Sequence, residues 1–134
     1  IIPENTAILS FKMTVGKVSI TTEKMLSNEA IAHMKIKKDS FLTSEYIYLF
    51  LLNLNFNSLG STSSIVMAIN TAIIKQIKFF IPDEITMKDF NQLVAPIFKK
   101  IKNNSEQIQT LEETRDSLLP KLMSGQKRVF EYDN

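Results

Sequence analysis

The chain has 134 residues, 44% of them hydrophobic, and a formal net charge of +2. This apolar content is typical of a folded chain, and the absence of cysteine excludes disulfides, zinc–thiolate sites and thiol nucleophiles. The absence of cysteine fits the reducing cytoplasm, where we expect the protein to be. No apolar run reaches the roughly 18 residues of a membrane span, so we expect no membrane association.

The charge is unevenly distributed along the chain. Residues 1–82 contain eight Lys, no Arg and five Asp or Glu. A local surplus of three positive charges permits binding to a polyanion, but it falls short of the basic patch that predicts a nucleic-acid-binding protein by itself.

The first 40 residues have the pattern of short strands. Residues 7–11 read as a buried strand, and residues 17–21 alternate apolar and polar side chains. Between them lies a loop in which Gly16 is free to adopt a positive φ. Residues 31–37 alternate again, with Ala32, Met34 and Ile36 expected on one face.

Residues 40–56 change to a helical pattern that is apolar on nearly all sides, which predicts a helix packed on the sheet and capped by Thr43 or Ser44. A loop of small residues, 58–64, follows. Asn70 is expected to cap one helical turn, 71–75, and residues 77–81 to form a closing strand ended by Pro82. The sum is an α+β domain with a small mixed sheet over residues 1–84.

The last third of the chain predicts one long helix, from a Thr86–Asp89 capping box to a stop at Gly125. Pro96 is expected to kink it near Val94, and Pro120 to kink or end it. Steps of four and three residues define an apolar seam in which eight of ten positions are apolar: Phe90, Val94, Ile97, Ile101, Asn104, Ile108, Leu111, Arg115, Leu118 and Leu122.

A lone helix would leave this seam exposed to water, so the seam requires a second helix. We expect residues 85–134 to serve in spacing and dimerisation, with the chain self-associating as an antiparallel pair. Asn104 and Arg115 interrupt the seam, and a polar residue at a core position can fix the register of a helix pair. Arg115, with Asp116 beside it, could equally anchor a partner subunit.

Four passages resemble the specificity subunits of type I restriction–modification enzymes. The most distinctive is Leu-Leu-Pro-Lys-Leu-Met-Ser-Gly at residues 118–125, although the acidic residue that usually follows is absent here. Residues 9–20 resemble the family's strand, Thr-Ile-Gly-Lys turn and strand, and residues 28–31 resemble its Asn-Gln-Ala-Ile stretch, with Glu29 in place of Gln. Residues 60–62, 69–70 and 79–82 resemble the loop, turn and strand that close a target-recognition domain.

The resemblance implies a non-catalytic subunit that recognises double-stranded DNA. In that family, two recognition domains each read half of a bipartite site, and two long helices between them set the spacing. The helices also dock modification subunits, which hold S-adenosylmethionine and methylate adenine, and through these the restriction subunit. This chain would then be part of one recognition domain, truncated at its start, with its helix and with no cofactor or metal of its own.

The resemblance also suggests DNA-binding residues, each with a simpler structural alternative. Lys12, Thr14 and Lys17 flank the Gly turn and would contact phosphates, or they are solvated residues of a hairpin. Ser61 and Thr62 would donate hydrogen bonds to DNA or only solvate a loop. Asn28 would contact DNA or stabilise a turn.

A second reading of the same residues involves no nucleic acid: an assembly module in which a small α+β cap sits on a dimerising helix. An enzyme is disfavoured, because the single histidine, His33, has no predicted partner and no metal or acid–base cluster is evident.

Overall fold

The computed structural model describes residues 1–12, 14–56 and 70–127. It divides into two compact units, an amino-terminal unit of Ile1–Pro96 and a carboxyl-terminal unit of Ile97–Asn134.

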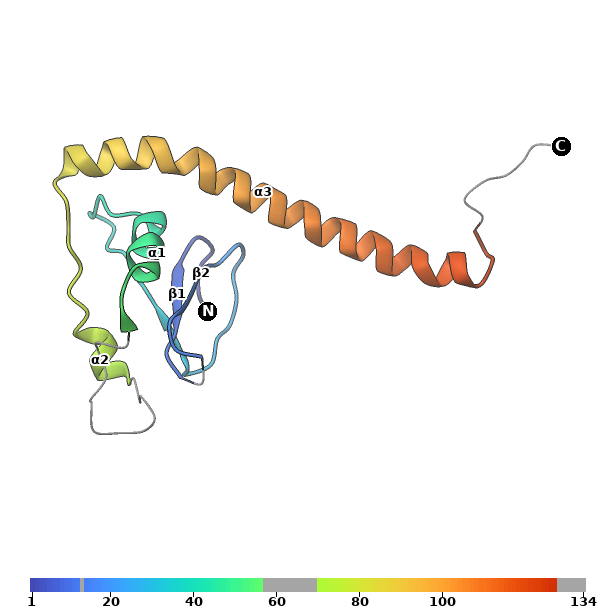
Figure 1. Ribbon diagram of the computed structural model, residues 1–134, viewed down its shortest axis with the longest axis horizontal. Helices are drawn as coiled ribbons and strands as arrows, with labels where there is room; N and C mark the ends of the chain where they lie inside the picture. Colours follow the sequence, from blue (N-terminus) through green and yellow to red (C-terminus); the bar gives the residue numbers. More distant parts are fainter. Residues whose placement is uncertain (13, 57–69, 128–134) are drawn as a thin grey trace. The chain divides into compact units, whose positions relative to one another are not determined.

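The amino-terminal unit contains a three-stranded sheet of β1 (Ala7–Ser10), β2 (Lys17–Ile20) and β3 (Ile31–His33) in the order β2-β1-β3 (Figure 1). Both neighbours pair antiparallel with β1, and Ser10 lies opposite both Lys17 and Ile31. The predicted α+β class is confirmed. Among the described residues the sheet is antiparallel, not mixed as expected, because a tight hairpin at residues 11–16 joins β1 to β2.

Helix α1 (Ser44–Leu52) lies beside β1 and β2 (Figure 1). Thr43 caps it, with its hydroxyl oxygen accepting a hydrogen bond from Tyr46 N at 3.4 Å. At the other end, Asn53 Nδ2 donates to the Leu49 carbonyl at 2.8 Å and helps to end the helix before residue 56. The core between α1 and the sheet is made of seven buried side chains: Ala7, Leu9, Phe11, Ile47, Leu51, Ile74 and Ile77.

Helix α2 (Thr71–Lys75) is capped by Asn70, as predicted. The closing strand predicted at residues 77–81 is wrong: the segment pairs with no strand of the described sheet. Ile77 is buried in the core instead, and the Phe79 ring lies 4.7 Å from the Phe50 ring of α1. The Tyr46 hydroxyl also donates to the Phe80 carbonyl. The alternating pattern that predicted a strand therefore arises from side-chain packing and not from strand pairing.

Helix α3 (Glu84–Met123) is 40 residues long and continues through Pro96 and Pro120, so Pro120 does not end it. It begins before Thr86, because Asp83 accepts hydrogen bonds from Thr86 N at 3.0 Å and Thr86 Oγ1 at 2.6 Å. These bonds hold the pKa of Asp83 below its ordinary value. At the far end, Gly125 adopts φ +73° and its N–H donates to the Leu122 carbonyl, which confirms the predicted stop.

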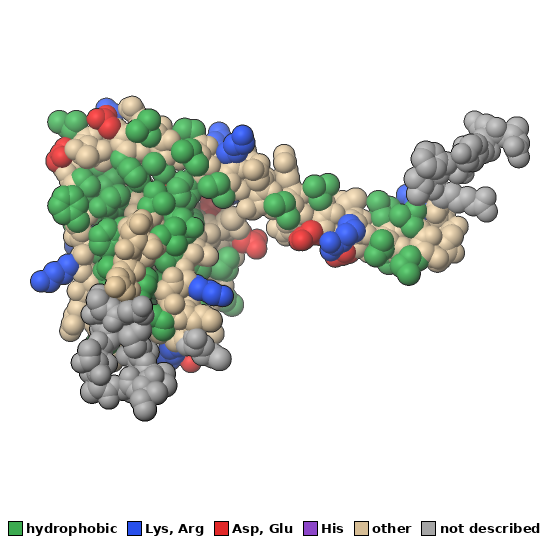
Figure 2. All heavy atoms as spheres, viewed as in Figure 1, with side chains coloured by type: hydrophobic (Ala, Val, Ile, Leu, Met, Phe, Trp, Pro, Cys, Tyr) green, Lys and Arg blue, Asp and Glu red, His purple; other side chains and the backbone are tan. Residues whose placement is uncertain are grey.

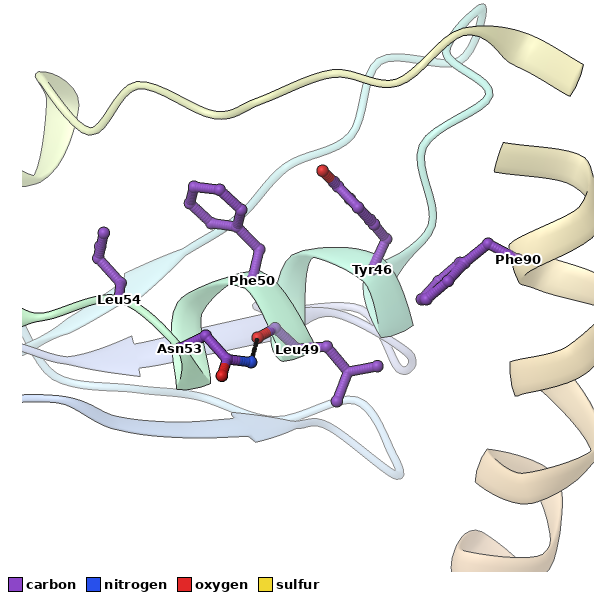
Figure 3. Close-up of a pocket in the computed structure, with 6 residues that line it drawn as sticks. All are labelled: Tyr46, Leu49, Phe50, Asn53, Leu54 and Phe90. Carbon is purple, nitrogen blue, oxygen red and sulfur yellow. Dashed lines mark hydrogen bonds between the residues drawn. The ribbon is translucent and has the colours of Figure 1, made fainter. Parts of the chain in front are cut away.

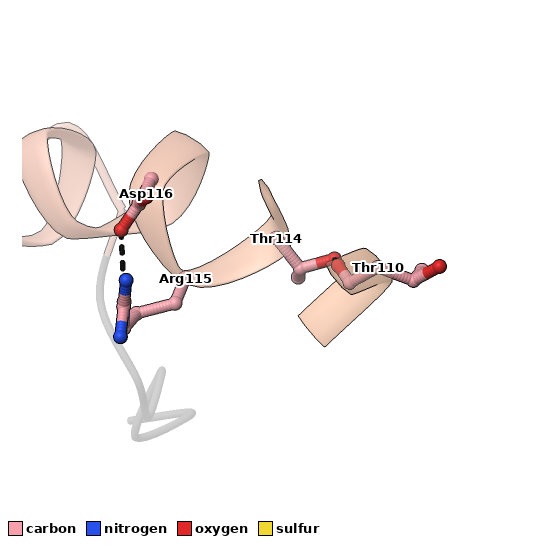
Figure 4. A network of polar contacts seen from close by, with 4 residues as sticks. All are labelled: Thr110, Thr114, Arg115 and Asp116. Carbon is pink, nitrogen blue, oxygen red and sulfur yellow. Dashed lines mark hydrogen bonds and ion pairs between the residues drawn. The ribbon is translucent and has the colours of Figure 1, made fainter. Parts of the chain in front are cut away.

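The carboxyl-terminal unit consists of α3 from Ile97 onwards and the turn that follows it. Over residues 97–127, which the structure describes, the side chains are exposed except for the half-buried Phe98 and Leu118. Arg115 Nε donates to Asp116 Oδ1 at 2.8 Å, which raises the pKa of Arg115, and Thr110 and Thr114 lie on the preceding turn (Figure 4). In the described ranges, no helix combines the length and apolarity needed to cross a membrane.

Candidate nucleic-acid interface

Four of the predicted DNA-binding residues lie at one end of the sheet. The loop that carries Lys12 and Thr14 leaves β1 after Ser10, and Lys17 begins β2 directly opposite Ser10. The turn that contains Asn28 enters β3 at Ile31, which also pairs with Ser10. The antiparallel register thus gathers two loops that are separated in the sequence.

The hairpin loop is held by its own hydrogen bonds. Gly16 adopts φ +86° and donates its N–H to the Ser10 carbonyl at 3.0 Å, while the hydroxyls of Ser10 and Thr14 lie 3.1 Å apart. A Cβ at residue 16 would lie 3.0 Å from Phe56 Cδ2, so glycine is needed for both conformation and space. The result is a defined turn with an exposed lysine on each side.

The second loop contributes a turn and a negative charge. Asn28 Oδ1 accepts a hydrogen bond from Ala30 N at 3.0 Å, an Asx turn that agrees with the simpler reading of Asn28. Phe11 N donates to the Ala30 carbonyl at 3.1 Å and holds the two loops together. Glu29 then lies beside Lys12, with Oε1 3.8 Å from Nζ, and both side chains are exposed.

This sheet end therefore presents two lysines, a threonine hydroxyl and one carboxylate. Such a set can bind phosphate through charge and hydrogen bonds, but Glu29 opposes the positive charge of Lys12. Sequence reasoning noted Glu29 only as a departure from a motif and missed its ion pair. Ser61 and Thr62, the other two candidates, lie outside the described residues.

The structure supplies His33 with a partner but no catalytic cluster. His33 Nε2 lies 2.6 Å from Ser27 Oγ, a contact that ties the loop before β3 to the strand. Among the described residues, no group of His, Asp and Glu is arranged to hold a metal ion.

The apolar seam is used differently in the two units. In the amino-terminal unit, Phe90 packs edge-on against Tyr46, with ring centroids 5.6 Å apart, and Val94 is half-buried. Met87 lies three residues before Phe90 and is only 1% exposed. It continues the spacing of the seam, and this spacing could have identified it as a buried position. From Ile97 onwards the seam is exposed apart from Leu118, including Asn104 and Arg115 and the apolar residues Ile97, Ile101, Ile108, Leu111 and Leu122.

Sequence reasoning also missed an apolar groove beside the seam. The groove, of about 300 Å³, lies between α1 and the start of α3 and is lined by Tyr46, Leu49, Phe50, Asn53, Leu54 and Phe90 (Figure 3). Apolar side chains gather on the same face of the amino-terminal unit, over α1 and the segment that leads into α3 (Figure 2). That segment contains Phe80, which is 73% exposed.

The architecture is a small α+β unit followed by a long helix with an exposed apolar seam. Two known proteins are similar to this chain in sequence. The chain is 35% identical over 107 residues to the specificity subunit of the type I restriction enzyme MjaIX of Methanocaldococcus jannaschii, covering 76% of this chain and 24% of that protein. It is 30% identical over 129 residues to the specificity subunit of the type I restriction enzyme HindI of Haemophilus influenzae, covering 93% of this chain and 28% of that protein.

The chain is thus similar, over most of its length, to specificity subunits of type I restriction enzymes. It spans about a quarter of the length of the curated relatives it matches. No family model matches it. No solved structure matches it either.

Proposed function

We propose that this chain takes part in sequence-specific DNA recognition as part of a type I restriction specificity subunit. The observation that carries the proposal is the similarity to two such subunits, which extends over most of the chain. The gathering of Lys12, Thr14 and Lys17 at one end of the sheet supports it, because two cations and a hydroxyl held close together suit a row of phosphates.

In this proposal the sheet end positions the protein on the DNA backbone. Lys12 and Lys17 supply charge to neighbouring phosphates, and the Thr14 hydroxyl donates a hydrogen bond. Asn28 holds its loop in place through the bond to Ala30 N rather than reading a base. Residues 1–82 contain no arginine, the commonest reader of guanine, so these contacts chiefly set position.

The long helix has a separate role in the proposal. Its exposed seam pairs with a second helix, fixes the distance between two recognition units and contributes to docking of the methyltransferase subunits, which bring in the restriction subunit. The chain itself performs no catalysis and binds no cofactor. In the absence of other subunits, the seam drives self-association of the chain.

Binding of a DNA duplex, measured by fluorescence anisotropy over a range of salt concentrations, tests the DNA-binding role. Each phosphate contact adds about 0.9 to the slope of log affinity against log salt, so Lys12→Ala or Lys17→Ala should lower the slope by about one. Lys24→Ala is the matched control, because Lys24 is also exposed but follows the opposite end of β2. Unchanged slopes in both loop variants would exclude this sheet end from DNA contact.

The competing function is an assembly module without nucleic acid, which the exposed seam favours independently of the lysines. Under that function the chain would associate through α3 yet bind no duplex, even when joined to the preceding region of a relative's recognition domain.

A further inference from the structure

The apolar groove on α1 contains a residue of the helix seam. Phe90 lines the groove together with α1 residues and is also the first of the ten seam positions. Whatever pairs with the amino-terminal end of the seam must therefore pass beside the groove. This inference rests on the helix pairing proposed above. What has to be found is which segment of the second helix lies at the groove.

The spacing of the seam identifies this segment. The ten seam positions are spaced symmetrically about Glu106, so the steps between them are the same in both chain directions. Two copies paired antiparallel about this position keep every core position opposite another core position. The alternating steps of three and four residues also match in each layer. The layers are Phe90 with Leu122, Val94 with Leu118, Ile97 with Arg115, Ile101 with Leu111 and Asn104 with Ile108.

The charges favour this direction over a parallel one. Lys99, Lys100 and Lys102 form a basic stretch, and Glu112 and Glu113 form an acidic one. A parallel pair in register would place the two basic stretches side by side, where like charges repel. The antiparallel pair places the basic stretch of one copy at the level of the acidic stretch of the other.

On each side of the seam runs a row of flanking residues, and the two rows differ in their side chains at both ends of the helix. Asn91, which follows Phe90, marks the flank that faces α1, because Thr43 Oγ1 donates to Asn91 Oδ1 at 3.0 Å. Leu93 marks the other flank and is 73% exposed. At the far end of α3, Leu119 is on the flank of Asn91 and Lys121 on that of Leu93.

In an antiparallel helix pair, equivalent flanks of the two helices lie on the same side of the interface. Leu119 of a second copy therefore reaches the α1 side, while its Lys121 faces the open side. Leu119 is 50% exposed and Met123, one turn further on, is 81% exposed. The end of α3 thus presents apolar side chains on the flank where the other copy presents an apolar groove.

We propose that the groove between α1 and Phe90 is the docking site for the carboxyl-terminal end of α3 from a second copy of this chain, with Leu119 and Leu122 as the inserted residues. The amino-terminal unit of one copy then binds the end of α3 of the other copy. This contact would attach the helix of one copy to the amino-terminal unit of the other, in addition to the helix–helix contact made by the seam.

Disulfide trapping tests the proposal, because the chain has no cysteine. A mixture of Leu49→Cys and Leu119→Cys chains should form a disulfide dimer under mild oxidation. Its yield should be several times that of either variant alone. The matched control mixes Leu93→Cys with Leu119→Cys, which places the first cysteine on the open flank and should give little dimer.

A third mixture, Ile101→Cys with Leu111→Cys, reports on helix pairing alone. If it forms dimer while Leu49→Cys does so no better than Leu93→Cys, the groove proposal is overturned and the pairing stands. If neither mixture forms dimer, both fail. Asn53→Cys, on the same groove, repeats the measurement should Leu49→Cys lower the melting temperature.

Discussion

At the scale of single residues, Glu29 sets the balance of charge at the candidate interface. It lies 3.8 Å from Lys12, and the two loops that carry them are joined by the bond from Phe11 N to the Ala30 carbonyl. A phosphate bound by Lys12 would approach the Glu29 carboxylate as well. The carboxylate is therefore expected to weaken DNA binding at this end of the sheet.

Glu29→Gln should strengthen duplex binding, because it removes the repulsion and releases Lys12 while the side chain keeps its size. Exposed ion pairs are worth about 0.2–1 kcal/mol, which corresponds to an increase of up to about fivefold. Anisotropy titrations at low salt measure the change. Glu23→Gln, an exposed residue beyond the opposite end of β2, serves as the control and should have a smaller effect. Equal effects of the two variants would indicate that only net charge matters.

At the scale of elements, the start of α3 depends on Asp83. Three of its interactions anchor the first turn: the Asp83 carboxylate accepts two hydrogen bonds from Thr86, and the Asp83 carbonyl accepts one from Met87 N. Met87 is buried in the amino-terminal unit, so fraying of this turn would also disturb its packing. The cap thus connects local helix formation to the stability of the unit.

The cap should make this stability depend on pH. Because folding lowers the pKa of Asp83, the stabilisation is complete above the ordinary value of 3.8 and is lost as the pH falls through the lower folded pKa. At pH 7, Asp83→Ala should therefore reduce the melting temperature. The difference in melting temperature between the variant and the parent chain should become smaller as the pH falls below 3.8. Circular dichroism melts between pH 7 and pH 2 measure this. Asp89→Ala, further along the same helix, is the control, and a difference that stays constant with pH would contradict the role of the charge.

At the scale of the whole molecule, the proposed helix pairing rests on the exposed seam of the carboxyl-terminal unit. Ile97, Ile101, Ile108 and Leu111 are each more than half exposed at regular spacing. Burial of such side chains stabilises an assembly by about 1.5–3 kcal/mol each. Asn104 and Arg115 interrupt the apolar stripe and restrict the registers in which two helices can pair.

Ile108→Asp should disrupt association, because a pair of identical chains loses this side chain twice and gains two buried charges. A loss of about 3 kcal/mol corresponds to roughly a hundredfold weaker dimer. Sedimentation equilibrium measures this directly, and the melting temperature of the parent chain should rise with concentration. Asn103→Asp adds the same charge outside the seam and should leave the dimer intact. A parent chain that sediments as a monomer at every concentration would contradict the proposed pairing.

The sequence by itself determined what depends on local chemistry. A run typical of a buried strand marked β1, and alternating side chains marked β2 and the start of β3. Side-chain oxygens marked the caps of α1 and α2 at Thr43 and Asn70. The helical period carried through Pro96 and Pro120, because each proline costs the helix a hydrogen bond that the remaining turns can offset. These features arise from interactions between residues close together in the chain.

Only the tertiary structure decided which distant segments meet. It kept residues 77–81 out of the sheet, since Ile77 enters the core and Phe79 packs on Phe50 of α1 without a strand partner. It also brought Glu29 beside Lys12 and Phe90 beside Tyr46. No local pattern encodes these contacts, because they depend on how the strands pair and where α1 packs.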